Sequence, residues 1–306
     1  MTPIRLRLAE MFRPIRRWAP RGYGFIYGRL MSERFVNYRG DPELKQRLDH
    51  RARYKVFYDE YLGANICSDL GDWASRAHYF EGIYYDRIVP MLIDRVLSGG
   101  GTFIDVGANR GLHSLYAGRV VGSRGHVYSF EPNPETFEVL KAHLTMNQVR
   151  NCTPINIGIS DTNAELKLNL FNDGHSGTCS FVASRQVMKA VSVPVRPLDE
   201  VLDATTLAGP LLIKIDVEGF EHRVLKGMKR FLARTDATVI CELTEEWLRQ
   251  AGSSADALVT DMVDSGYQVM VPHVRYRHLV KEYLDLKPFD TLPRVSQTDV
   301  VFVRNG

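Results

Sequence analysis

The sequence is poor in the features that mark disulfide-bonded, secreted and membrane-spanning proteins. It holds only four cysteines in 306 residues. They are scattered without a C-x-x-C spacing, which argues against a zinc site or a disulfide framework and is typical of a reducing compartment. No stretch approaches the roughly 18 to 20 consecutive apolar residues of a membrane helix, and the N-terminus lacks the apolar segment of a secretory signal. These absences predict a cytoplasmic protein, with an organelle transit peptide as the alternative for the Arg-rich start.

A strong net charge is also lacking, since the formal value is only +3, and we therefore expect no nucleic-acid partner. The charge is unevenly spread, because residues 1–40 contain nine arginines and two glutamates. We interpret this basic N-terminal arm as poorly ordered or docked on the domain, because Pro14 and Pro20 limit helix length. The alternative is an amphipathic segment, residues 1–30, in weak peripheral contact with an anionic membrane.

From residue 99 onward, strand and helix patterns alternate, which predicts a parallel sheet in an α/β fold. Seven segments are expected to be core strands: residues 103–106, 126–130, 153–157, 211–215, 237–241, 267–271 and 299–303. Upstream, Asp41-Pro42-Glu43 is a good helix start. Apolar residues that include Phe57 and Tyr61 suggest further helices before the core.

The most informative stretch is T-F-I-D-V-G-A-N-R-G over residues 102–111. Dinucleotide sites usually contain G-x-G-x-x-G, whereas Gly107 and Gly111 are spaced G-x-x-x-G. Asp105 lies two residues before the first glycine, where it would repel a pyrophosphate but suit a ligand that carries a cation. The pattern predicts a site for S-adenosylmethionine and disfavours a nicotinamide oxidoreductase.

Other residues fit the same cofactor. Glu131 follows Gly111 by twenty residues and ends a strand, the usual place for an acid that binds ribose hydroxyls; the alternative is an acid that favours the next helix N-terminus. Asn109 is expected at the amino-acid end of the cofactor or as a turn residue. Ser160 and Asp161 are expected where the adenine would lie. An equally good interpretation of Asp161 is that it only shapes its turn.

Methyl transfer to a hydroxyl requires alignment of the acceptor and removal of its proton. Asp216 and Glu218 follow the strand 211–215, where the methyl group should emerge, and Lys214 precedes them. We predict that Asp216 or Glu218 is the base or orients the acceptor.

Several residues are second choices for this role. They are Glu221, Glu242, His222 and His113. The alternative for Glu221, and also for Glu218, is an acid that favours a helix N-terminus. His222 is expected more readily on an exposed helix face, and His113 is equally well explained as a packed histidine. Asp216, Glu218 and Glu242 also offer oxygen ligands for a divalent cation, but metal dependence is not the favoured interpretation.

Five segments resemble, in order and spacing, the FkbM family of S-adenosylmethionine-dependent methyltransferases: F-I-D-V-G-A-N-x-G (103–111), F-E-P-N-P (130–134), G-I-S-D (158–161), P-L-D-E (197–200) and K-I-D-V-E-G-F-E (214–221). The resemblance implies a Rossmann-like class I methyltransferase, a mostly parallel seven-stranded sheet with helices on both faces and a reversed last hairpin, here with a basic helical N-terminal extension. It also implies transfer to a hydroxyl of a sugar, polyketide or similar small secondary metabolite or glycan.

The expected organisation is therefore the arm 1–40, a helical region over residues 41–98 and the methyltransferase domain over residues 99–306. The alternative function is a catalytically idle cofactor-binding scaffold that docks on a membrane through the arm. The acids at 216 and 218 argue against it.

Overall fold

The computed structural model describes Met11 and residues 53–81, 86–171, 179–182, 187–234, 236–277, 281–289 and 297–304. The chain divides into two compact units, one of Met1–Tyr85 with Asn172–Thr178 and one of Asp86–Phe171 with Cys179–Gly306. Apart from Met11, the basic arm and its expected membrane contact lie outside the described residues. No helix in the described ranges is long and apolar enough to cross a membrane.

The first unit contains a β-hairpin, so the prediction of a helical region over residues 41–98 is wrong here. Its elements within the described residues are β1 (Tyr54–Asp59), β2 (Ala64–Asp69) and α6 (Trp73–Glu81), with β1 and β2 antiparallel. In β1, Phe57 and Asp59 are buried while Val56 and Tyr58 are exposed. This alternation has the period of a strand, and it outweighs the helical spacing of Phe57 and Tyr61.

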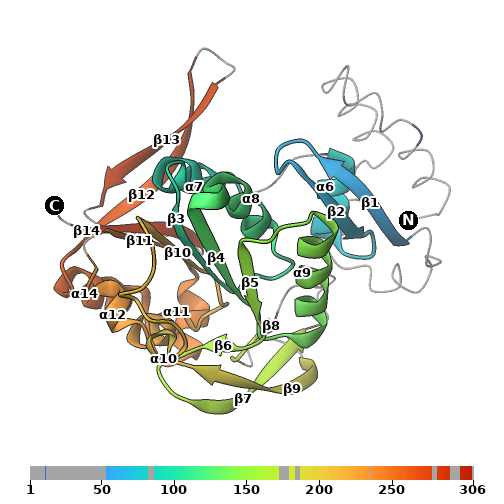
Figure 1. Cartoon of the computed structure of the whole chain (residues 1–306). Helices are drawn as coiled ribbons and strands as arrows, with labels where there is room; N and C mark the ends of the chain where they lie inside the picture. The colour runs from blue at the N-terminus through green and yellow to red at the C-terminus, as the bar shows by residue number, and fades with distance from the viewer. Residues whose placement is uncertain are drawn as a thin grey trace. The chain divides into compact units, whose positions relative to one another are not determined.

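The second unit is built on one large sheet, which confirms the expected α/β fold (Figure 1). The strand order is β13-β12-β14-β11-β10-β3-β4-β5. The bounds are β3 (Gly101–Val106), β4 (Gly125–Phe130), β5 (Cys152–Ile155), β10 (Leu211–Ile215), β11 (Ala237–Leu243), β12 (Tyr267–Arg277), β13 (Lys281–Pro288) and β14 (Thr298–Arg304).

The sheet has the seven expected strands and one more. Strands β5, β4, β3, β10 and β11 are parallel, and β14 enters antiparallel between β11 and β12. The additional strand is β13, which pairs antiparallel with β12 along the outer edge. Because β12 runs to Arg277 rather than ending near residue 271, its outer edge is long enough to carry this eighth strand.

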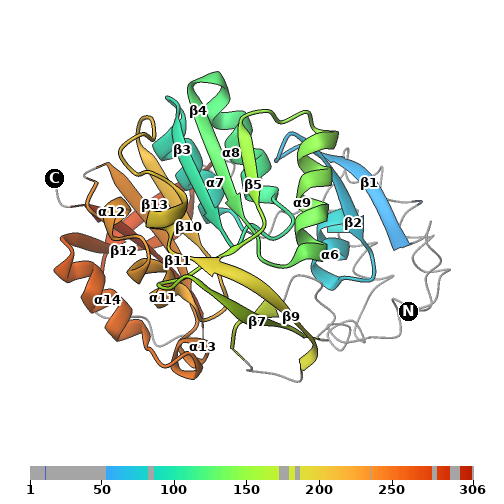
Figure 2. The ribbon, with the colours of Figure 1, turned by 60° about the horizontal axis from the view of Figure 1, so that its bottom comes forward.

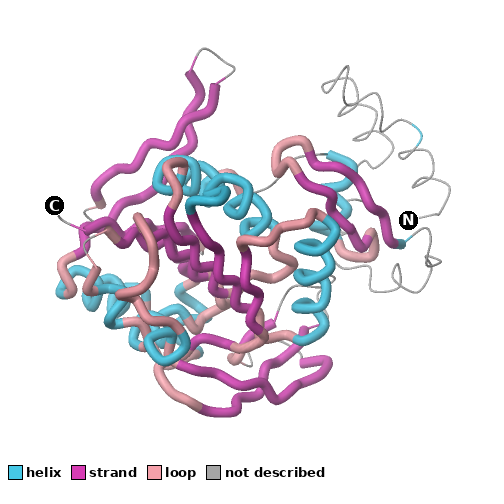
Figure 3. Tube along the Cα trace, viewed as in Figure 1, coloured by secondary structure: helices cyan, strands magenta, loops and turns pink. Residues whose placement is uncertain are grey.

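A second sheet has the order β6-β9-β7-β8 and lies apart from the large one (Figures 2 and 3). Its strands are β6 (Gly158–Ile159), β7 (Ala164–Phe171), β8 (Cys179–Ser180) and β9 (Val187–Arg196). The sequence alternation over residues 165–171 and 191–195 indicated β7 and β9. The sheet matters for the site because β8 places Ser180 beside the loop after β10.

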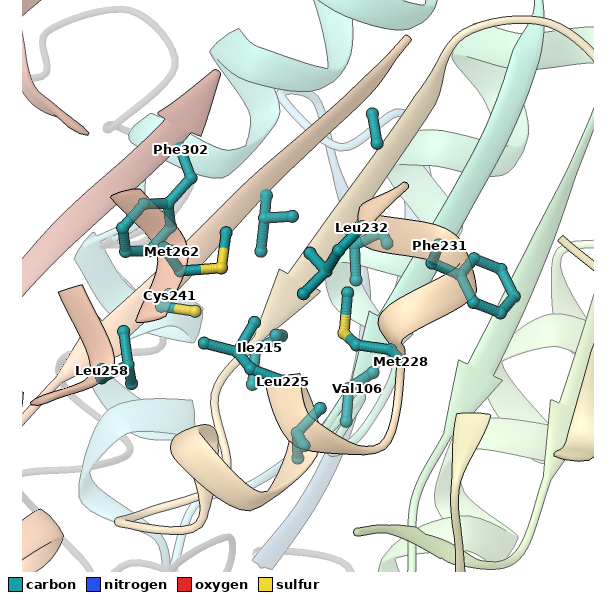
Figure 4. Close-up of a cluster of buried hydrophobic side chains, with 14 of the residues drawn as sticks. Val106, Ile215, Leu225, Met228, Phe231, Leu232, Cys241, Leu258, Met262 and Phe302 are labelled. Atoms are coloured by element: carbon teal, nitrogen blue, oxygen red, sulfur yellow. The ribbon is translucent and has the colours of Figure 1, made fainter. Parts of the chain in front are cut away.

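Helices cover both faces of the large sheet, as expected. They are α7 (Ile88–Leu97), α8 (Leu112–Val121), α9 (Pro134–Met146), α10 (Leu198–Val201), α11 (Glu221–Lys226), α12 (Lys229–Leu232), α13 (Glu245–Gln250) and α14 (Ala255–Asp264), with a 3-10 turn, η2 (Gly122–Arg124). Helices α7 and α8 contact β3, and they also reach β10 and β4, respectively. Val106, Ile215 and Cys241 on the opposite face pack with side chains of α11, α12 and α14 (Figure 4).

The apolar spacing over residues 220–231 predicts one helix, but two short helices form. The chain is interrupted at Gly227, where a Cβ atom would lie 1.9 Å from the carbonyl oxygen of Ser160. This close approach lets the turn after β6 pack directly on the end of α11. The interruption therefore comes from a tertiary contact that local periodicity does not report.

Candidate active site

One face of the large sheet carries charged residues, and the strand register brings them together. Asp105 on β3 lies directly opposite Lys214 on β10. On β11, Glu242 lies opposite Asp299 of β14. Residues directly opposite each other, and residues two apart on one strand, share a face, so these four side chains lie on the same side. Asp216 joins them at the end of β10, because its Oδ2 lies 3.3 Å from Lys214 Nζ. We call this set the polar face.

Glu131 is placed at the end of β4 and holds two loops. Its Oε2 accepts a hydrogen bond from the Asn109 backbone N–H at 2.8 Å, and its Oε1 accepts one from the Asn133 N–H at 2.8 Å. The side chain is buried, and burial raises its pKa to about 7 against the lowering effect of these two bonds. Asn133 also caps α9 by accepting from the Glu135 N–H. The carboxylate thus stands beside the glycine turn with its position fixed.

The glycine turn itself has a shape that requires glycine. Gly107 has φ +78°, and a Cβ atom there would lie 1.9 Å from the Asp216 carbonyl oxygen. Gly111 is the N-cap of α8 with φ +77°. Asn109 also has positive φ, and its Oδ1 is buried with no hydrogen-bond partner among the described residues. An unpartnered acceptor and a carboxylate in a glycine turn fit the ammonium and ribose groups of S-adenosylmethionine.

Asp105 is fully buried under this turn rather than open to solvent. Ser114 of α8 donates a hydrogen bond to Asp105 Oδ2 at 2.6 Å, and Ser129 of β4 donates to Ser114 at 2.7 Å. Within the described ranges Asp105 Oδ1 makes no hydrogen bond; the Lys214 ammonium lies 3.5 Å away. The two serines were not identified from the sequence, because a serine in a helix or strand gives no signal until its neighbours across the fold are known.

Lys214 is a buried cation between carboxylates. Its Nζ lies close to Asp216 and Asp105 and donates to the Gly107 carbonyl oxygen at 3.3 Å. Burial alone would lower its pKa, but the Asp216, Asp105 and Asp86 carboxylates outweigh burial and raise the pKa well above its usual range. Lys214 therefore keeps its charge and cannot serve as a proton acceptor.

The loop after β10 is shaped by Glu221. Its Oε1 accepts from the backbone N–H groups of Val217 and Gly219, at 3.2 and 3.0 Å. The side chain is buried, and burial raises its pKa to about 7. Glu218 adopts a positive φ of 54°, and its carbonyl oxygen accepts from Ser180 of β8. These contacts favour the helix N-terminal alternative for Glu221 over a role as base.

His222 is buried, so the expectation of an exposed helix residue is wrong. Its Nε2 lies 2.7 Å from Asp261 on α14, and its Nδ1 contacts the Ser253 hydroxyl. These partners tie α11 to α14 and to the segment just before it. Hydrophobic spacing along α11 does not reveal them, because they are 31 and 39 residues away.

Ser160 and Asp161, predicted to border an adenine, lie in the turn after β6. Ser160 is buried and donates to Asp161 Oδ1 at 3.1 Å. Arg223 forms an ion pair with the same carboxylate at 2.6 Å. Burial would raise the pKa of Asp161, but the Arg223 and Ser160 hydrogen bonds lower it overall. The carboxylate therefore links this turn to α11, which supports its turn-shaping interpretation.

Glu242 and Asp299 form the outer end of the polar face. Burial and the neighbouring Asp216 and Asp299 carboxylates raise the pKa of Glu242, while the Gln297 side chain donates to Glu242 Oε1. Burial, with Asp86 and Asp216, raises the pKa of Asp299 to about 7. Asp299 was not identified from the sequence, although an acid at the start of an apolar strand was an available signal.

His113 and Asp86 lie at the starts of α8 and α7. His113 Nε2 is 3.0 Å from Asp86 Oδ2, and both side chains are largely buried. Asp86 also accepts from the Ile88 and Val89 backbone N–H groups through Oδ1. Asp86 was missed from the sequence, where it reads as an ordinary acid before a helix. The packed-histidine alternative for His113 thus acquires a specific partner.

The alternative of a divalent cation at Asp216, Glu218 and Glu242 finds no support in the structure. Across the ranges that the structure describes, no group of three or more His, Cys, Asp or Glu side chains is arranged to hold a metal ion. The site that remains is a buried, hydrogen-bonded turn with acids and one lysine at the carboxyl ends of parallel strands. Such strand ends are the usual binding position in open α/β sheets.

Comparisons with known proteins agree with this geometry. The Methyltransferase FkbM domain model matches residues 105–269, more than half of the chain. The hexuronic acid methyltransferase AglP of Haloferax volcanii is 28% identical over 141 residues, which are 44% of this chain and 53% of that protein. A probable cobalt-precorrin-6B C(15)-methyltransferase (decarboxylating) of Sulfolobus acidocaldarius is 36% identical over 74 residues, covering 24% of this chain and 36% of that protein.

The chain thus spans about half or less of the length of these curated relatives. Among solved structures, an FkbM methyltransferase from Methylobacillus flagellatus is 18% identical with a TM-score of 0.43, over 76% of this chain and 55% of that chain. The family match runs from the acid of the glycine-turn strand through β10 and β11 into β12. On this match, the chain belongs to the FkbM family of methyltransferases.

Proposed function

We propose that this protein is an S-adenosylmethionine-dependent methyltransferase that methylates a hydroxyl group of a small molecule or glycan. Membership of the FkbM family supports the cofactor and the type of reaction. The observation that carries the proposal is the placement of Glu131 beside the glycine turn, with each carboxylate oxygen held by a backbone N–H. An acid so fixed at the end of the second parallel strand suits a pair of ribose hydroxyls.

The other proposed cofactor contacts come from the glycine turn, from the strand before it and from the turn after β6. Glu131 would accept from the ribose hydroxyls, and the unpartnered Oδ1 of Asn109 would accept from the ammonium group. Asp105 would supply a negative charge beneath the glycine turn of Gly107 and Gly111. Ser160 and Asp161 would border the adenine. The cofactor supplies a methyl group already activated on a positively charged sulfur, so positioning is the main task of the protein.

The acceptor is proposed to lie at the carboxyl ends of β10 and β11. Asp216 is the proposed orienting group for the acceptor hydroxyl, because its carboxylate is held in place by Lys214, whose Nζ lies 3.3 Å from Asp216 Oδ2. Glu218 and Glu242 would flank the acceptor from the loop and from β11. We place sugars first among acceptors because AglP is a hexuronic acid methyltransferase. Polyketides and other small secondary metabolites come second.

Cofactor binding is tested by calorimetric titration of the full chain with S-adenosylhomocysteine. We expect binding by the wild type and its loss in Glu131→Ala and Asp105→Ala. Asp216→Ala and Glu218→Ala should bind normally. An absence of wild-type binding at millimolar ligand would defeat the proposal.

Transfer is tested with methyl-labelled S-adenosylmethionine and a panel of pyranosides, uronic acids and polyketide alcohols, with products read by mass spectrometry. Label on an acceptor oxygen supports the proposal, and Asp216→Ala should lower the rate. Cofactor binding without transfer to any acceptor would instead support the idle scaffold.

A further inference from the structure

The loop after β10 contains one peptide unit that is held from both sides. It joins Glu218 to Gly219. Its N–H donates to Glu221 Oε1 at 3.0 Å, and its carbonyl oxygen accepts from the Ser180 hydroxyl at 2.7 Å. Both anchoring side chains are buried. They come from different elements, since Glu221 begins α11 and Ser180 belongs to β8 of the second sheet. We call this arrangement the Glu218 clamp.

The clamped peptide lies between two residues with left-handed backbone. Glu218 has φ +54° and Gly219 has φ +104°. Glycine adopts such angles readily, whereas a glutamate there costs free energy and persists only where its surroundings impose it. Residues held in this way concentrate at binding and catalytic sites. Loss of either anchor would let the peptide rotate and let Glu218 return to a commoner conformation.

Ser180 is itself fixed in place. Its Oγ accepts a hydrogen bond from the Val182 backbone N–H at 3.0 Å. The hydroxyl hydrogen goes to the Glu218 carbonyl oxygen, because a carbonyl oxygen only accepts. Phe181 packs on Phe220 with the ring centroids 4.8 Å apart, which ties the residue after β8 to the same loop. The Ser180 anchor is therefore a rigid one.

The clamp keeps Glu218 at the polar face. The residue is only partly buried, and burial together with acidic neighbours that include Glu218 raises the pKa of Glu242 at the end of β11. Burial together with the Glu131 and Glu218 carboxylates likewise raises the pKa of the Cys179 thiol, directly before Ser180. Strand β8 therefore borders both the proposed ribose-binding acid and the loop that is proposed to flank the acceptor.

We propose that Ser180 is a positioning residue for the acceptor, which acts through the backbone of Glu218. This inference rests on the proposed methyl transfer to an acceptor at the carboxyl ends of β10 and β11. The acceptor contacts the Glu218 side chain, and the Ser180 hydroxyl holds that side chain in the one conformation that meets it. Removal of the hydroxyl therefore weakens acceptor binding and leaves the cofactor contacts of the glycine turn intact.

The test uses the full chain with Ser180→Ala, Glu218→Ala and the double variant, on the acceptor found with labelled cofactor. The matched control is Ser192→Ala, which removes an exposed hydroxyl that donates to Glu165 within the same small sheet. We expect Ser180→Ala to raise the acceptor KM about tenfold, the order expected for one hydrogen bond, with a smaller change in kcat. S-adenosylhomocysteine affinity should stay within about threefold, because uniform binding of the acceptor alone is affected. Ser192→Ala should match the wild type.

Two further readouts separate positioning from general loosening of the fold. The acceptor KM of the double variant should lie within about twofold of that of Glu218→Ala, because the effects of a residue that acts through another do not add. Hydrogen exchange, followed by mass spectrometry of peptides that span residues 216–220, should be faster in Ser180→Ala, since the Gly219 N–H belongs to the clamped peptide. Ser192→Ala should leave this exchange unchanged.

Four results would overturn the assignment: an unchanged acceptor KM in Ser180→Ala, unchanged exchange over residues 216–220 in that variant, loss of its S-adenosylhomocysteine binding, or effects of Ser180→Ala and Glu218→Ala that multiply in the double variant. If the wild type transfers label and Ser180→Ala does so with the same KM, only this inference fails. If the wild type transfers label to no acceptor, the proposed function fails and the inference falls with it.

Discussion

Replacing Glu221 with glutamine should stabilise the protein in a pH-dependent way. Glu221 Oε1 accepts both loop N–H groups, while Oε2 is buried and has no partner within the described residues. Glutamine keeps the accepting oxygen and puts an uncharged NH₂ in place of the unpartnered oxygen. The variant therefore removes a buried charge without removing a hydrogen bond.

The magnitude follows from the folded-state pKa. Burial raises the pKa of Glu221 from 4.5 to about 7. The folded state then binds more protons than the unfolded state between these values, so the wild type loses stability as the pH rises through this window. At about 1.36 kcal/mol per pKa unit, the free energy of unfolding falls by about 1 kcal/mol at pH 5 and by about 3 kcal/mol at pH 8, relative to the protonated carboxyl group. Glu221→Gln should escape this loss.

The assay is urea denaturation followed by circular dichroism at pH 5 and pH 8. The advantage of Glu221→Gln over the wild type should grow by about 2 kcal/mol between the two pH values. Glu131→Gln is the contrast, because Glu131 uses both oxygens and the amide leaves one backbone N–H facing NH₂, at a cost of about 1 to 3 kcal/mol. An equal advantage at both pH values, or a loss at pH 8, would refute the reasoning.

Other expected outcomes concern the cofactor turn. Gly107→Ala should lower the melting temperature and abolish S-adenosylhomocysteine binding by calorimetry, because its Cβ would lie 1.9 Å from the Asp216 carbonyl oxygen; Gly99→Ala, with nothing within 4 Å, is the neutral control. Ser114→Ala should lower the free energy of unfolding in urea by about 1 to 3 kcal/mol, because it leaves the buried Asp105 without its hydroxyl donor. Unchanged stability and affinity would argue against that contact. Asp216→Asn should lower labelled-methyl transfer while S-adenosylhomocysteine affinity holds; unchanged transfer would remove Asp216 from the acceptor site.

Local patterns predicted much of the fold. The β10 strand over residues 211–215 begins and ends where the sequence indicated, because period, glycine and charge act over a few residues. The hairpin of β1 and β2 was missed, since its apolar residues also fit a helical spacing. Strand β13 was missed for another reason: its position depends on the outer edge of β12, which no local pattern describes.

The candidate site divides in the same way. Asp105, Glu131 and Asp216 were selected because an acid at a strand end is visible in the sequence and parallel strands end together. Ser114, Asp86 and Asp299 were not, because each acquires its meaning from a partner on another element. His222 shows the limit most clearly, since its partners Asp261 on α14 and Ser253 just before it hold a buried side chain that spacing alone placed at the surface.

The sequence by itself determined seven strands of the large sheet, the glycine turn and the acids that end the parallel strands, because these depend on interactions between near neighbours. Only the tertiary structure decided which of these acids are held by a lysine, a serine or a backbone N–H. It alone brought His113 to Asp86, 27 residues apart, and Glu242 to Asp299 across two strands. Strand register and helix packing fix such distances through burial of the whole core, and burial in turn sets the charge that each carboxyl group carries.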